Sequence, residues 1–189
     1  MIEDCDTVDI VRFIIGLFSE ALGEEEDRVI TVGTGVGQPT GYASGGLGIQ
    51  CQAVGGNLGF DDIIDLIYLL PAKWKKAASF YVHKNNIREL RKLKDSENRY
   101  IWMDSPAPGQ PSTIYGYPVI EDNNLSEAEI YFGDLKKAYY LGDRKRMTVK
   151  ISNDESKAFE QDQTAIRVVQ RVAGTVVRPT GLKCLNSIP

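Results

Sequence analysis

The feature that most restricts this fold is a glycine-rich stretch between residues 32 and 59, which contains GTGVGQPTG at 33–41 and more glycines after it. Glycine is unfavourable inside helices, and Pro39 removes a backbone donor, so helix is excluded here. The composition predicts tight turns across 34–41 and a short strand at 47–54. Regular helices are therefore expected before and after this stretch, and none is expected to continue through it.

A long helix is predicted before this stretch, over residues 6–30. Apolar residues recur there at helical spacing on two adjoining stripes, so we expect the helix to be well buried. Asp6 is expected to cap its N-terminus. Gly16 and Gly23 weaken the helix and would let another backbone come close.

Strands outnumber helices in the rest of the chain. Two more helices are predicted at about 61–70, ended by Pro71, and at about 85–93, capped by Asn85. Strands are predicted at 79–82, 100–103, 117–121, 128–132, 138–141, 147–151 and 166–177, with a Pro/Gly-rich loop at 105–113. Since helices come first and do not alternate regularly with strands, the pattern favours the α+β class over a doubly wound parallel sheet.

The charge balance argues against tight nucleic-acid binding. The chain has 189 residues with 22 Lys and Arg against 26 Asp and Glu, a net charge of −4. The clusters of basic residues at 73–76, 88–94 and 144–146 are local and are matched by acids. No apolar run is long enough to span a membrane, and we expect a soluble, intracellular protein.

No residue pattern indicates catalysis, a metal site or a cofactor. His83 is the only histidine, and Cys5, Cys51 and Cys184 are widely spaced, so we expect unpaired, buried cysteines in a reducing compartment. The acidic pairs, including Glu121 with Asp122, are interpreted as caps and solvated faces. The glycine run fits no phosphate-binding motif, although a nucleotide-binding enzyme that uses residues 33–41 stays open as a remote alternative.

Short strings in a fixed order along almost the entire chain resemble the major capsid proteins of tailed bacteriophages. They are GVGQPTG at 35–41, DDIIDLIYLLPAK at 61–73, LRKLKDS at 90–96, RYIW at 99–102, GQP at 109–111, GYPV at 116–119, FGD at 132–134, and Arg171 with VRP at 177–179. Each string is weak alone, but the ordered set is specific.

This resemblance implies the Hong Kong phage capsid fold. A peripheral domain with a long spine helix would comprise residues 1–44 and 145–175, and an axial domain with a central sheet would comprise 45–144 and 176–189. The implied function is a structural head protein that assembles into pentamers and hexamers of a shell around DNA, in the virion or in the host cytoplasm. Scaffold, portal and maturation protease are the implied partners, with DNA only nearby and no membrane. The assembly candidates are Gly35, Gly37, Gln38, Pro39, Gly41, Gly109, Gln110, Pro111, Tyr117, Pro118, Arg171 and Pro179.

Two departures from the family pattern affect assembly. Met1 stands just before the spine helix, where the family has an N-terminal arm and an extended loop, so the chain looks like a trimmed subunit that would not complete a shell. The positions that crosslink some family members correspond to Asp162 and Val169, which cannot perform that reaction. A bacterial nanocompartment shell protein, which shares the fold and encloses an enzyme, is the alternative.

Overall fold

The computed structural model describes residues 10–56, 58–94, 97–102, 112–152, 165–186 and 188. Helices and strands both occur throughout this part of the chain. In order they are α1 (Ile10–Val32), β1 (Gln50–Ala53), α2 (Phe60–Leu69), α3 (Ala72–Lys75), β2 (Ser79–Val82), α4 (Lys84–Lys92), β3 (Thr113–Ile114), β4 (Tyr117–Glu121), β5 (Ile130–Gly133), α5 (Leu135–Ala138), β6 (Tyr139–Ser152), β7 (Ala165–Val176), a short 3-10 turn (Pro179–Gly181) and β8 (Leu182–Asn186).

A mixed six-stranded sheet in the order β1-β8-β5-β2-β4-β3 forms the centre of the molecule. β1 pairs with β8, and β2 with β4, in parallel, whereas β5 is antiparallel to both of its neighbours. The predicted α+β class is confirmed. β8 comes from the C-terminal end of the chain yet lies between β1 and β5.

Alternating side chains bury both faces of this sheet, as period-two strands require. Phe80 of β2 and Phe132 of β5 lie on one face with their ring centroids 4.4 Å apart, and α2 and α4 contribute Leu66 and Leu90 to the same core. On the other face, Tyr131 and Cys184 pack in a second core, with residues 42–49 of the glycine-rich stretch and with α5. The sheet is therefore the rigid centre to which the other elements attach.

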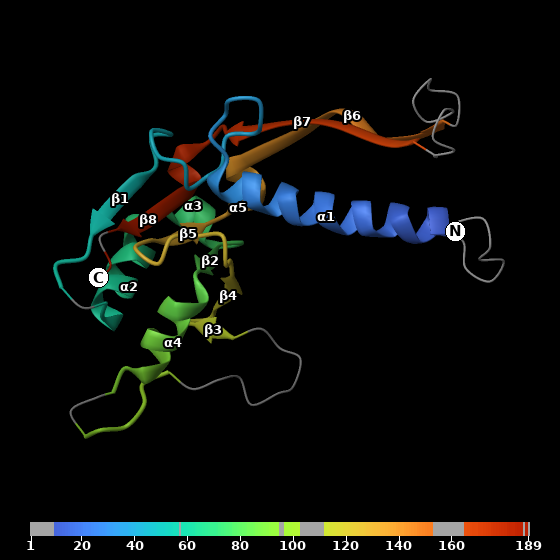
Figure 1. Cartoon of the computed structure of the whole chain (residues 1–189). Coiled ribbons are helices and arrows are strands. Elements are labelled where there is room, and N and C mark those ends of the chain that lie inside the picture. Colours follow the sequence, from blue (N-terminus) through green and yellow to red (C-terminus); the bar gives the residue numbers. More distant parts are fainter. Residues whose placement is uncertain are drawn as a thin grey trace.

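β6 and β7 form a separate, long antiparallel ribbon. Figure 1 shows α1 and this ribbon extending in the same direction, away from the six-stranded sheet. The side-chain amide of Gln170 on β7 donates to Glu26 of α1, and the hydroxyl of Ser19 approaches the sulfur of Met147 at 4.0 Å. α1 thus lies against one face of the ribbon.

The prediction of a well-buried α1 is wrong for the single subunit. Phe13 is 62% exposed and Leu17 is 50% exposed, and α1 enters the core only near its C-terminal end, at Val29 and Thr31. The helix projects beyond the sheet, so most of its apolar surface has no partner among the residues that the structure describes. A side-chain carbon added at Gly16 would contact nothing, so the expected close approach of another backbone is also missing there. Asp6 lies outside the described residues.

Several other local predictions need correction. His83, not Asn85, caps α4, because its ring Nδ1 accepts a hydrogen bond from the Asn85 amide at 3.3 Å. The strand predicted at 100–103 is reduced to an isolated bridge between Tyr100 and Lys94 among the described residues. The strands predicted at 138–141 and 147–151 are one strand, β6, which continues through irregular pairing between Asp143 and Thr148.

We expect Phe132→Ala to lower the free energy of unfolding by about 3–5 kcal/mol, because it opens a cavity where the sheet meets the helices. The Phe132 side chain is fully buried, whereas the matched control, Val36→Ala, changes a side chain that is 85% exposed. The control should alter stability by no more than about 0.5 kcal/mol. Urea unfolding followed by circular dichroism measures both, and a loss below about 1 kcal/mol for Phe132→Ala would contradict this description of the core.

Candidate functional site

The glycine-rich candidates form one compact loop beside the end of α1. Gly35 has φ +80° and Gly37 has φ +71°, conformations that favour glycine, and Thr34 and Thr40 pair across the turn. The side-chain amide of Gln38 donates a hydrogen bond to the Thr34 hydroxyl at 2.9 Å. A side chain at Gly41 would collide with the carbonyl of Thr31, so this position needs glycine for close approach.

Three backbone amides of this loop donate hydrogen bonds within the chain. Gly35 N–H donates to the carbonyl of Pro39 at 3.3 Å, Gly41 N–H to Gly33 at 2.8 Å, and Thr40 N–H to Gly174 of β7 at 2.8 Å. A phosphate cradle needs free, converging amides. The loop instead ties the C-terminal end of α1 to the ribbon, and its geometry gives the nucleotide-binding alternative no support.

The remaining candidates lie in separate places. Tyr117 and Pro118 are on β4 and pair with β3, and the Tyr117 ring packs 5.1 Å from that of Phe132. Pro179 lies in the 3-10 turn before β8. Arg171 is on β7, directly opposite Lys145 on β6. Gly109, Gln110 and Pro111 lie outside the described residues. The structure therefore joins the candidates of the glycine loop but does not bring all the candidates into one site.

Asp122 connects α1 to the end of β4, a role that the sequence did not reveal. Its carboxylate accepts hydrogen bonds from the Thr31 hydroxyl at 2.7 Å and from the Tyr42 hydroxyl at 2.8 Å. The other carboxylate oxygen accepts from the Asn124 amide at 2.9 Å. The interpretation of Asp122 as a solvated acid is therefore wrong. Its partners lie 80 and 91 residues away in sequence, so no local pattern could have identified them.

Three tyrosines that pack beneath this junction have perturbed acidity. Burial, helped by the nearby Asp122, raises the pKa of Tyr42 far above its ordinary value. Burial and then Asp134 raise the pKa of Tyr81 to about 12, and burial with Glu129 raises that of Tyr131. The rings of Tyr42 and Tyr131 meet edge to face with centroids 5.2 Å apart. These hydroxyls are held neutral, which suits a structural junction.

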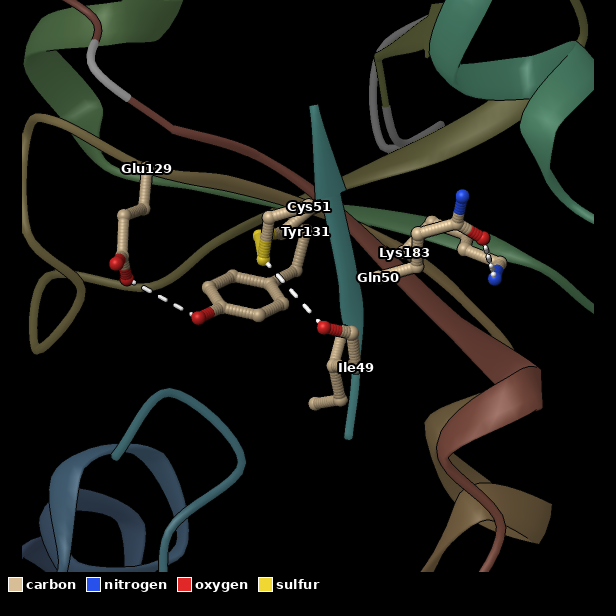
Figure 2. The surroundings of a disulfide bond; sticks show 7 residues. Ile49, Gln50, Cys51, Glu129, Tyr131 and Lys183 are labelled. Carbon is tan, nitrogen blue, oxygen red and sulfur yellow. Dashed lines mark hydrogen bonds between the residues drawn. A yellow bond between two sulfur atoms is a disulfide. The ribbon is translucent and has the colours of Figure 1, made fainter. Parts of the chain in front are cut away.

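Cys51 and Cys184 form a disulfide across the parallel pair β1 and β8, so the expectation of unpaired cysteines is wrong for these two. They are register partners with Cα atoms 4.4 Å apart, although 133 residues separate them in sequence. Figure 2 shows Tyr131 beside this bond, with its hydroxyl directed to Glu129, and Lys183 reaching Gln50 at 2.8 Å. The edge strand β1 is thus fastened to the sheet covalently.

The described residues contain no cluster of three or more His, Cys, Asp or Glu side chains that could hold a metal ion. His83 is nearly buried and serves as the helix cap, with Glu127 of the loop between β4 and β5 3.9 Å away. Of the described helices, none is long and apolar enough to cross a membrane. The candidate residues therefore form structural contacts between elements, or lie on exposed surfaces.

Comparison with known proteins agrees with this arrangement. The sequence model of the phage capsid family matches residues 3–187. The chain belongs to the phage capsid family. The family assignment confirms the resemblance found in the ordered strings, and the mixed sheet with its projecting helix and ribbon is that family's fold.

Individual relatives share this fold over nearly the whole chain. The capsid of the native GTA particle matches with a TM-score of 0.83 and 25% identity, over 98% of this chain and 68% of that one. The major capsid protein of Enterobacteria phage HK97 is 25% identical over 122 residues, which are 65% of this chain but only 31% of that protein. An encapsulin from Synechococcus elongatus has a TM-score of 0.67 at 17% identity, covering 98% of this chain and 68% of that one, and shows the fold alone. This capsid-family chain therefore aligns with less than a third of its curated relative.

The stability of this capsid-family chain should fall at alkaline pH because of its buried tyrosines. The pKa of Tyr81 is about 12 in the folded state against an ordinary value of 10.0, so folding favours the neutral hydroxyl. Its contribution is complete below pH 10 and is lost as pH rises toward 12. Urea unfolding between pH 8 and 11.5 should show a shallower decline for Tyr81→Phe than for the wild type. The exposed Tyr68→Phe control should follow the wild type, and equal slopes for all three would contradict the assignment.

Reduction of the disulfide should lower the free energy of unfolding by about 2–5 kcal/mol, because the bond closes a long loop in the unfolded chain. Thermal unfolding with and without a phosphine reductant measures this loss. Cys51→Ser should be insensitive to the reductant, since it removes one of the two sulfur atoms of the bond. Cys5→Ser should keep the wild-type response, and a lost response in that variant would show a different pairing.

Proposed function

We propose that this chain is the shell-forming part of a major capsid protein from a tailed phage or prophage, which assembles in many copies into an icosahedral shell around DNA. The family match over residues 3–187 is the observation that carries the proposal. The agreement with the GTA particle capsid over 98% of the chain supports it. We infer a structural role without catalysis, metal or cofactor.

The proposed division into domains fits the two sheets. The peripheral domain, residues 1–44 and 145–175, contains α1 and most of the β6–β7 ribbon, and the axial domain, 45–144 and 176–189, contains all six strands of the central sheet. The boundary at 144/145 falls inside β6, which begins at Tyr139. The two proposed domains would therefore share a continuous strand.

The exposed apolar residues of α1 support assembly as well. Phe13, Leu17 and Phe18 are 39–62% exposed along a helix that projects from the sheet. Large exposed apolar surfaces on a soluble subunit are typical of protein contacts. We propose pentamers and hexamers of this subunit as its main partners, with scaffold, portal and maturation protease as transient ones, in the virion or in the host cytoplasm. DNA would lie nearby without a specific site, and no membrane partner is proposed.

Covalent crosslinking is not part of the proposal. Val169 lies on β7 opposite Thr148 and has no group that could accept a proton. Asp162, the other corresponding position, lies outside the described residues, and an ionised carboxylate there would be a poor acyl donor. The absence of a crosslink at Asp162 stays a prediction, as does the expectation that this chain alone forms a monomer or small ring and no closed shell.

A nanocompartment shell is the second candidate, because an encapsulin shares the fold. Particles purified from cells that carry this gene distinguish the two functions. We expect peptides of this chain to dominate nuclease-treated particles that still contain protected DNA, as judged by mass spectrometry and phenol extraction. Particles without DNA but with one abundant enzyme would favour the nanocompartment. Particles of either kind that lack this chain would contradict the proposal.

A further inference from the structure

A charged surface without acidic neighbours among its described lining residues lies on the β6–β7 ribbon. Four cations from the two strands line one shallow depression together with Thr148 and Val169, and none of the described residues that line it is acidic. We call this surface the basic ribbon face, and its cations are Lys145, Lys150, Arg167 and Arg171. All four side chains are exposed. The local basic clusters of the sequence did not predict it, because its members come from both strands.

The pairing register places like charges directly opposite each other on this face. Lys145 is the register partner of Arg171, and Lys150 is the partner of Arg167. Like charges opposite each other destabilise a strand pair, and a two-stranded ribbon is only marginally stable. None of the four cations forms an ion pair with another described residue. A negatively charged partner would remove this repulsion.

The basic ribbon face is directed away from its own α1. Gln170 and Val172 alternate with Arg171 along β7, and both line the surface between the ribbon and α1. Because successive side chains of a strand point to opposite faces, Arg171 lies on the far face. The far face is therefore open to another molecule.

The chain itself contains a segment with the complementary charge. Residues 1–9 include four carboxylates and no Lys or Arg, at Glu3, Asp4, Asp6 and Asp9. Nine residues can span about 30 Å when extended. The segment is joined to the N-terminal end of α1 (Figure 1), and α1 contacts the near face of its own ribbon through Ser19 and Glu26. The far face of the ribbon on a second copy offers this segment four cations of complementary charge.

We propose that residues 1–9 of one copy bind the basic ribbon face of a neighbouring copy. The contact pairs four carboxylates with four cations and neutralises two like-charge cross-strand pairs. Nucleic acid fits less well, because the chain is acidic overall and the face has no aromatic side chain for base stacking. This inference rests on the proposed function, since it assigns a contact between copies of a shell subunit.

Self-association of the full chain, measured by sedimentation velocity in 50 mM and 500 mM salt, tests the proposal. The wild type should associate more weakly at high salt. The ribbon variant Lys150→Glu/Arg167→Glu and the segment variant Glu3→Lys/Asp4→Lys should each associate at least tenfold more weakly than the wild type at low salt. A control with the same charge change as the ribbon variant, Lys76→Glu/Lys136→Glu, should behave as the wild type.

An equimolar mixture of the two variants provides the decisive measurement. The mixture retains one intact contact, between the ribbon of the segment variant and the segment of the ribbon variant, so association should recover. Failure to recover, or a wild type that does not associate even at millimolar concentration, would overturn the proposal. Salt-sensitive binding of a 30-base-pair duplex that needs the ribbon cations but not residues 3 and 4 would assign the face to nucleic acid instead.

A charge-neutralising variant tests whether weaker self-association results from misfolding of the ribbon. Lys150→Gln/Arg167→Gln removes one like-charge pair, so its melting temperature should equal or exceed that of the wild type while its self-association weakens. A merely destabilised ribbon would lower the melting temperature, and that outcome would contradict the proposal. Particles that contain this chain but form equally well with the ribbon variant would refute this inference and leave the proposed function intact.

Discussion

The whole structure depends on the insertion of β8 between β1 and β5. Its register places Lys183 opposite Gln50 on one side and Phe132 on the other, so backbone groups on both sides of β8 are satisfied. Leu182, Cys184 and Leu185 are completely buried, and their side chains contribute to both cores. Without β8, β1 would have no partner and the sheet would end at β5.

This insertion also explains how the ribbon is held. The chain leaves the sheet after β5, runs out along β6, returns along β7 and re-enters as β8. Both ends of the ribbon are therefore anchored in the sheet, and the hydrogen bonds of Asp122 to Thr31 and Tyr42 anchor α1 beside them. A two-stranded ribbon and a projecting helix would be marginal alone, and here they take their orientation from the sheet.

The parts of α1 and of the β6–β7 ribbon that extend beyond the sheet have exposed apolar side chains and neighbouring like charges. α1 exposes Phe13 and Leu17, and the ribbon carries like charges opposite each other. Both features cost stability unless other groups cover the apolar side chains and neutralise the charges. A subunit that must assemble reversibly benefits from surfaces of this kind, because many separate weak contacts allow errors to be corrected.

The sequence by itself determined the local elements. The helices at α2 and α4, the strands β2 and β4, and the turns of the glycine loop follow from periodicity, proline and glycine, which act over a few residues. The ordered strings also identified the capsid family. The exposure of α1, the disulfide between Cys51 and Cys184, the role of Asp122 and the basic ribbon face could be seen only in the folded chain. Each of these depends on residues that lie far apart in the chain and meet only through strand register and packing, which no local pattern encodes.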